Sequence, residues 1–134
     1  MLKQLSIYAE NKKGALQAMT NALYEAGINI WGSVTNDGAE YGINRMVVSD
    51  PEKAKEVLTE KGYLCRFVDV LAVEIEDKPG ALNTLLTALL DSNVNVDYTY
   101  LSFNRDSSTP VMILHTADPE EVEICLKAKG FKMC

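Results

Sequence analysis

The sequence has few of the residues from which metal and redox sites are built. It contains a single histidine, His115, and three cysteines, Cys65, Cys125 and Cys134, in 134 residues. The cysteines are odd in number and show no CxxC spacing, so they predict neither a disulfide framework nor a zinc site. Buried or terminal free thiols are the expected alternative. We therefore predict no metal and no cofactor.

Positive charge is also scarce. The chain has 13 basic and 19 acidic residues, a net charge of −6 and a pI near 4.8. Phosphate binding needs clustered lysine and arginine, and the basic residues here are scattered, so no nucleic-acid partner is predicted. No apolar run approaches the length of a membrane span, and the start MLKQLSIYAE does not resemble a signal peptide. We therefore expect a cytoplasmic protein with no membrane partner.

Familiar enzymatic motifs are absent as well. The sequence has no GxGxxG, no P-loop and no GxSxG. His115 lies in a predicted strand, where a lone histidine is more often structural than catalytic, and no cysteine has a histidine nearby in sequence to activate it. Glu10, Glu76 and Asp77 could form an acidic pair, but acids at strand ends are usually solvated. We predict no catalytic residues.

The sequence does contain an internal duplication. Residues 5–35 align with residues 71–101, with the turn ENKKGAL in the first copy and EDKPGAL in the second. Further along, the sequence DPE occurs in both copies, at residues 50–52 and 118–120, and the larger offset shows that the second copy contains two extra residues before it. Chance alone would not keep these blocks in order. We therefore predict two tandem repeats, residues 1–67 and 68–134.

Each repeat has the periodicity of a βαββαβ unit. Apolar and polar residues alternate before each glycine turn and take helical spacing after it. Asn36-Asp37-Gly38 predicts a hairpin turn, and Asp50 and Asp118, each followed by proline, predict helix N-caps. Two helices on one face of a four-stranded antiparallel sheet make a ferredoxin-like α+β sandwich. Because each repeat alone is small, we expect the two sheets to be packed or joined side by side.

Apolar residues at helical spacing predict one apolar face for the first helix in each repeat. They are Leu16, Met19, Ala22, Leu23 and Ala26 in the first copy, and Leu82, Leu85, Leu86, Leu89 and Leu90 in the second.

The glycine turn is the first candidate for a binding site. Gly80 allows a sharp bend at which a backbone or a ligand can approach closely. The N–H groups of Ala81 and Leu82, at the start of the helix, can hold a carboxylate. The alternative is a turn that merely joins a strand to a helix.

A pair of asparagines is the second candidate. Asn29 and Asn95 each begin the second strand of a repeat between two inward apolar residues, so each points away from the core. A side-chain amide offers a donor and an acceptor to a zwitterion. The alternative is a polar residue on an exposed strand face.

The order of these features resembles the ACT domain family. A strand, a D-x-P-G-x-L turn, an amphipathic helix and a strand that starts Asn-Ile or Asn-Val occur in sequence, and the resemblance covers essentially the whole chain as two ACT repeats. Proteins similar to this are regulatory modules that bind small molecules, mostly amino acids, at interfaces between ACT domains. They are commonly attached to enzymes of amino-acid metabolism. The resemblance implies a stand-alone, non-enzymatic sensor or regulatory subunit.

The resemblance also implies the site residues. The ligand loop corresponds to Asn11, Lys12, Lys13, Gly14, Ala15 and Leu16 in the first copy and to Asp77, Lys78, Pro79, Gly80, Ala81 and Leu82 in the second, followed by Asn29 and Asn95. The first copy departs by having Asn11 and Lys13 in place of the aspartate and proline. The second has Ser92-Asn93 where the first keeps Gly27. Which copy binds a ligand stays open.

Trp31 and Asp97 occupy equivalent positions on the same strand face as the asparagines. They could shape a pocket for the ligand's side chain, where Asp97 would favour a polar or cationic group, with histidine as one candidate. The alternative for Trp31 is that it fills an interface between the sheets.

We therefore expect an amino-acid-binding regulator that forms a homodimer, because uncovered sheet faces and strand edges need partners. Its partner would be an amino-acid metabolic enzyme or a regulator. The main alternative is a protein–protein adaptor without a small ligand. A catalytic ferredoxin-like protein is a remote third, since the enzymatic motifs are missing.

Overall fold

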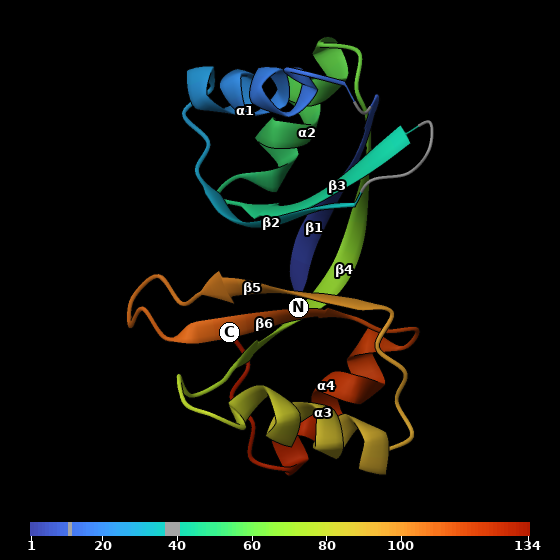
Figure 1. Ribbon diagram of the computed structural model, residues 1–134, viewed down its shortest axis with the longest axis vertical. Coiled ribbons are helices and arrows are strands. Elements are labelled where there is room, and N and C mark those ends of the chain that lie inside the picture. The colour runs from blue at the N-terminus through green and yellow to red at the C-terminus, as the bar shows by residue number, and fades with distance from the viewer. Residues whose placement is uncertain (11, 37–40) are drawn as a thin grey trace. The chain divides into compact units, whose positions relative to one another are not determined.

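The computed structural model of the chain describes residues 1–10, 12–36 and 41–134. Two compact units are present: an N-terminal unit, Lys3–Val68, and a C-terminal unit, Asp69–Cys134 with Met1–Leu2. The elements in chain order are β1 (Leu2–Glu10), α1 (Ala15–Glu25), β2 (Ile30–Asn36), β3 (Tyr41–Val48), α2 (Pro51–Glu60), β4 (Leu64–Glu74), α3 (Ala81–Asp91), β5 (Tyr98–Phe103), β6 (Pro110–His115) and α4 (Pro119–Ala128) (Figure 1). The predicted hairpin turn at Asn36-Asp37-Gly38 lies mostly outside the described residues.

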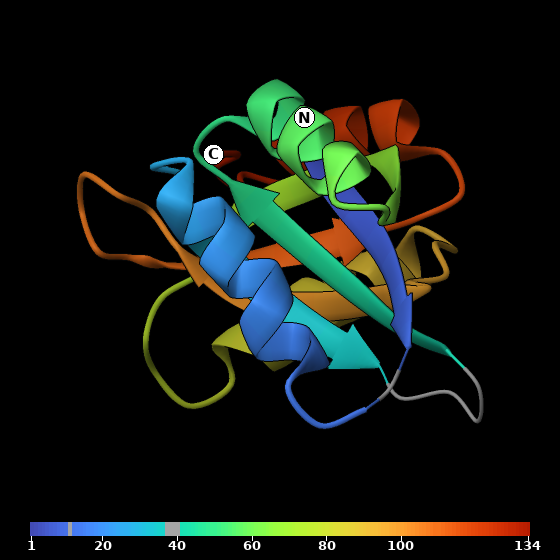
Figure 2. The same cartoon turned by 90° about the horizontal axis from the view of Figure 1, so that it is seen from above.

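The N-terminal unit is a ferredoxin-like sandwich. Its strands follow the order β2-β3-β1-β4, to which β4 contributes its first residues. β1 and β3 pair antiparallel, with Leu5 opposite Met46, and β2 pairs antiparallel with the other edge of β3. Helices α1 and α2 lie on one face of these strands, in front of them when viewed from above (Figure 2). The predicted fold class is confirmed in this unit.

The C-terminal unit repeats this arrangement with a reduced last strand. β4, β6 and β5 are neighbours in that order, and Leu71 of β4 lies opposite Leu114 of β6. The last strand of the predicted βαββαβ order is only a bridge between Met133 and Val73. Two backbone hydrogen bonds hold it, from the Glu74 N–H to the Lys132 oxygen at 2.9 Å and from the Cys134 N–H to the Ala72 oxygen at 2.8 Å.

The two units have separate apolar cores of matching composition. The core of the N-terminal unit includes Leu5, Ile7, Met19, Leu23, Met46, Ala54 and Leu58. The core of the C-terminal unit includes Leu71, Val73, Leu85, Leu89, Leu114, Val122 and Leu126. In each unit the core side chains come from both helices and from the face of the sheet that the helices cover.

The buried stripe of each first helix is narrower than its sequence pattern predicts. In α3 only Leu85 and Leu89 are buried, whereas Leu82, Leu86 and Leu90 are 38%, 37% and 75% exposed. Leu16 of α1 is likewise exposed. A helix on a sheet buries one stripe of its surface, and these leucines lie beside that stripe. The apolar face of each first helix is therefore wider than the part of it that is buried.

The ends of the helices can be compared between the two repeats. Asn93 takes a left-handed φ of 57°, as Gly27 does at the equivalent position with a φ of 73°. Asparagine is one of the few residues that adopt this conformation at modest cost, so the exchange leaves the helix end intact.

Asp50 caps α2 by accepting a hydrogen bond from the Lys53 N–H at 3.1 Å, but Asp118 makes no such bond to α4. Asp118 nevertheless occupies the predicted N-cap position of α4, and Pro119 follows it at the first helical position.

No helix among the described residues combines the length and the apolar character needed to cross a bilayer.

Neighbouring leucines on α3 test the assignment of the core. Replacing the buried Leu89 by alanine should lower the free energy of unfolding by about 2–5 kcal/mol, because the change leaves a cavity. Leu90→Ala, the matched control at an exposed position, should change it by less than about 0.5 kcal/mol. Urea unfolding of both variants measures the difference, and equal losses would contradict the assignment.

Candidate functional site

The glycine turns begin α1 and α3 in the same conformation. Gly14 and Gly80 have φ values of 84° and 87° and serve as the N-caps of the two helices. A Cβ atom at either position would meet no atom within 4 Å. Glycine is therefore needed here for its left-handed backbone, and the space around it is open.

Of the two amides predicted at the start of α3, those of Ala81 and Leu82, only that of Leu82 is free of a backbone partner among the described residues. The Ala15 N–H donates to the Lys12 oxygen at 3.1 Å, and the Ala81 N–H donates to the Lys78 oxygen at 3.2 Å. The next amides, of Leu16 and Leu82, have no backbone partner among the described residues. These positions carry the positive end of the helix dipole, so they offer the better site for an anion.

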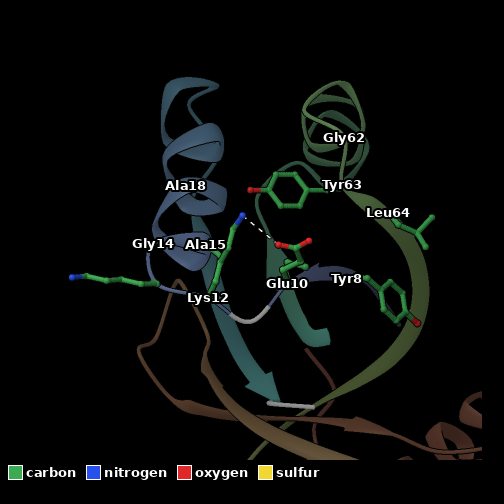
Figure 3. A pocket seen from close by; sticks show the side chains of 11 residues that line it. Tyr8, Glu10, Lys12, Gly14, Ala15, Ala18, Gly62, Tyr63 and Leu64 are labelled. Atoms are coloured by element: carbon green, nitrogen blue, oxygen red, sulfur yellow. Dashed lines mark ion pairs between the residues drawn. The ribbon is translucent and has the colours of Figure 1, made fainter. Parts of the chain in front are cut away.

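A cavity of about 820 Å³ opens beside the turn of the N-terminal unit. It extends from Gly14 and Ala15 to Tyr63, which follows α2 (Figure 3). Lys12 and Glu10 point toward one another in its wall and form an ion pair of 3.2 Å between Nζ and Oε2. The predicted residues Lys13, Gly14 and Ala15 all line this cavity.

The C-terminal unit has a cavity of about 390 Å³ at the matching place. Ala81 and Lys78 line it from the turn, and Phe131 takes the position that Tyr63 has in the first repeat. Lys78 pairs with Glu76, and Lys132 pairs with Glu74 at 3.3 Å. Both repeats therefore keep a hollow at the start of the first helix, although the side chains around it differ.

The asparagines lie at the other end of those helices. Asn29 precedes β2 and has an exposed side chain; its N–H donates to the Ser49 hydroxyl, and its backbone oxygen accepts from the Ser49 N–H. Asn95 is also exposed and precedes β5. Each asparagine is thus separated from the glycine turn of its own repeat by an eleven-residue helix, about 16 Å long. Within one repeat, the turn and the asparagine do not form one site.

A polar network surrounds Asn95 that sequence reasoning missed. Asp97 accepts a hydrogen bond from the Asn95 side chain at 3.2 Å and pairs with His115 through Oδ2 and Nδ1 at 2.9 Å. Tyr98 stacks on the His115 ring with centroids 4.9 Å apart. The contact depends on the strand register, which the sequence alone does not give: His115 lies opposite Tyr98 where β5 and β6 pair, and Asp97 directly precedes Tyr98.

The remaining predicted residues are dispersed. Asp77 and Pro79 are exposed and do not line the cavity beside Gly80, and Trp31 is half-buried on β2. Asn11 lies outside the described residues. The individual positions of the ligand loop therefore stay predictions.

Two of the thiols are poorly suited to nucleophilic chemistry. Burial raises the pKa of the Cys65 thiol, and burial together with the Glu74 carboxylate raises the pKa of the Cys134 thiol. A nucleophilic cysteine normally has a lowered pKa, so these two show no sign of activation.

Comparison with known families and structures gives a consistent result. A family model described as an ACT domain pair matches residues 1–131. A solved protein from Bacteroides thetaiotaomicron is similar with a TM-score of 0.90 and 30% identity, over 99% of this chain and 91% of that one. No curated protein sequence matches significantly.

Regulatory subunits of aspartate kinase have the same fold. The ligand-free subunit from Thermus thermophilus is similar with a TM-score of 0.67 and 17% identity, over 94% of this chain and 88% of that one. The subunit from Thermus flavus is similar with a TM-score of 0.62 and 19% identity, over 96% of this chain and 91% of that one. At these identities the likeness shows the fold alone.

Substitution of Gly80 tests the left-handed turn. Gly80→Ala should destabilise the protein by about 1 kcal/mol, because a side chain strains this backbone even where space is free. Gly80→Asn should cost less, since asparagine tolerates a positive φ. The two variants are compared by urea unfolding, and an alanine variant as stable as the wild type would contradict the role given to this turn.

Proposed function

This chain belongs to the ACT domain family, as an ACT domain pair, and from that premise we propose that it is a regulatory protein that binds a free amino acid and has no enzymatic activity. The observation that carries the proposal is the duplicated hollow at the start of α1 and α3. A regulatory role for a small ligand agrees with the family and with the fold shared with aspartate kinase regulatory subunits.

The ligand's carboxylate is proposed to bind at a helix start. The N–H groups of Leu16 and Leu82 lie at the positive end of the helix dipole and have no backbone partner among the described residues. In the N-terminal unit Lys13 adds positive charge to the cavity wall, where Lys12 is paired with Glu10. Helix N-termini are well suited to hold carboxylates, so these amides replace Ala81 as the proposed donors.

The ligand's other end is proposed to meet an asparagine of a different ACT repeat. A free amino acid is much shorter than the roughly 16 Å helix between Gly80 and Asn95, or between Gly14 and Asn29. It can contact both kinds of residue only where the turn of one repeat meets the asparagine of another. A second copy of the chain can supply that repeat. Asp97, bonded to Asn95, makes histidine one candidate ligand.

Homodimer formation is part of this proposal. β5 is a terminal strand in the strand order, and its residues Leu101 and Phe103 are 51% and 54% exposed. Exposed apolar edge strands tend to pair with another chain. An amino-acid metabolic enzyme or a regulator would be the controlled partner, and the cytoplasm the expected location.

One observation favours the alternative of an adaptor without a small ligand. Leu82, Leu86 and Leu90 form an exposed apolar row along α3, spaced one helical turn apart. Such a row suits contact with another protein. An adaptor would use this helix and leave the hollows empty.

Thermal melting against each of the twenty amino acids separates the two functions. A ligand that binds only the folded state at a hundred times its Kd adds about 2.7 kcal/mol of stability and raises the melting midpoint. We expect one amino acid, or a small group of them, to raise it. No shift with any amino acid at millimolar concentration would contradict the sensor function and favour the adaptor.

Alanine variants locate the site once a ligand is known. Asn29→Ala or Asn95→Ala should reduce the ligand-induced shift, because each removes a donor and an acceptor from the ligand's polar end. Asn21→Ala, on the exposed side of α1, is the matched control and should leave the shift unchanged. A full shift in both test variants would place the ligand elsewhere.

A further inference from the structure

A separate cavity of about 420 Å³ lies in the C-terminal unit, away from the glycine turn. Its walls come from the end of α3 and the start of α4, with Asn95 and Asp97 leading into β5. We propose that this cavity binds an organic cation through the ammonium or guanidinium group. The inference deepens the proposed function, on which it rests for the view that the protein binds a small molecule.

The first observation is the charge of the cavity wall. Three carboxylates, of Asp97, Asp118 and Glu121, line the cavity, and none of the described lysines or arginines lines it. Asp97 is already paired with His115. Asp118 and Glu121 have no ion pair or side-chain hydrogen bond within the described part of the chain. Two carboxylates are therefore available to a positively charged group.

The second observation is a buried hydroxyl without a partner. Thr116 is 2% exposed and lies in the cavity wall, and its Oγ1 has no hydrogen-bond partner among the residues that the structure describes. An unsatisfied buried hydroxyl is costly, and such groups in native proteins usually have a protein, water or ligand partner. An N–H donor that enters beside Asp118 would supply one after a small shift of the wall. This hydroxyl points to a ligand independently of the charges.

The first repeat shows that neither feature is required by the fold. At the positions equivalent to Asp97, Thr116 and Glu121 it has Trp31, Val48 and Lys53. Its Asp50 is the counterpart of Asp118 and is engaged in capping α2. The same scaffold thus folds without the two unpaired carboxylates and without the orphan hydroxyl. Their presence in the second repeat is a property of this cavity.

The rest of the wall indicates the class of cation. Val94, Ala117 and Val122 supply apolar surface next to the carboxylates, which suits a methylene chain. Among the residues that the structure describes, no three histidine, cysteine or acidic side chains are placed to hold a metal ion. An alkylammonium or alkylguanidinium compound, such as lysine, arginine or a diamine, fits better than an inorganic ion.

Calorimetry of the full chain with matched probes tests the inference. The probes are L-lysine, L-arginine and 1,5-diaminopentane, with L-norleucine as the uncharged counterpart of lysine. Lysine should bind about tenfold more tightly than norleucine, because only lysine brings a charge to the carboxylates. Diaminopentane, which has no carboxylate, should bind as well.

Variants assign the effect to the cavity. Asp118→Asn and Glu121→Gln should each weaken binding of the cationic probes about three- to tenfold. Glu120→Gln, an adjacent acid of the same helix turn that does not line the cavity, should leave binding unchanged. Thr116→Val, which copies Val48, should weaken binding without lowering the melting midpoint of the free protein. If Asp118→Asn disturbs the helix start, Glu121→Gln carries the test.

The outcomes separate this inference from the proposed function. Binding of neutral amino acids with no preference for cations would overturn the inference and leave the sensor function standing. Binding of diaminopentane that depends on Glu121, with no amino acid bound, would support the inference and overturn the sensor function. Equal losses in the Glu120 and Glu121 variants would mean general attraction to an acidic protein, and would overturn the inference.

Discussion

The left-handed glycine between the first strand and the first helix is the constraint on which each repeat depends. Gly14 and Gly80 reverse the direction of the chain, so that the helix after the turn packs on the sheet that contains the preceding strand. The same turn leaves the second amide of each helix, that of Leu16 or Leu82, without a backbone partner among the described residues, and a hollow opens beside the helix start. The bend that makes the sandwich possible therefore also creates the feature most suited to an anion.

The duplication keeps this scaffold and lets its chemistry diverge. Asn93 replaces Gly27 with the same backbone conformation, so the helix end survives the exchange. Around the start of the second helix the side chains change character: Lys53 becomes Glu121, and a capping aspartate becomes a free one. Because the exposed ends of a sandwich carry little of its core, they can change charge while the fold remains. The two repeats of one ACT pair thus offer different surfaces to a ligand.

Several features of the fold were predictable because they depend on local rules. The order of strands and helices follows from periodicity, glycines with positive φ and proline at the first helical position. Other features were not. The width of the buried stripe on α3 depends on how the helix sits on the sheet, so Leu82, Leu86 and Leu90 could not be separated from Leu85 and Leu89 by spacing. Whether the N-cap residue Asp118 also makes a side-chain hydrogen bond to α4 depends on its rotamer, which no motif specifies.

The sequence by itself determined the duplication, the ferredoxin-like architecture and the resemblance to the ACT family, because these rest on patterns that repeat along the chain. Only the tertiary structure decided which residues share a site. It placed Gly80 and Asn95 at opposite ends of one helix, and it brought Asp97 into contact with His115. It also placed Thr116 in the same cavity wall as Asp118 and Glu121. Such neighbours come from different elements, and their distances are set by strand register and helix packing, which periodicity alone does not encode.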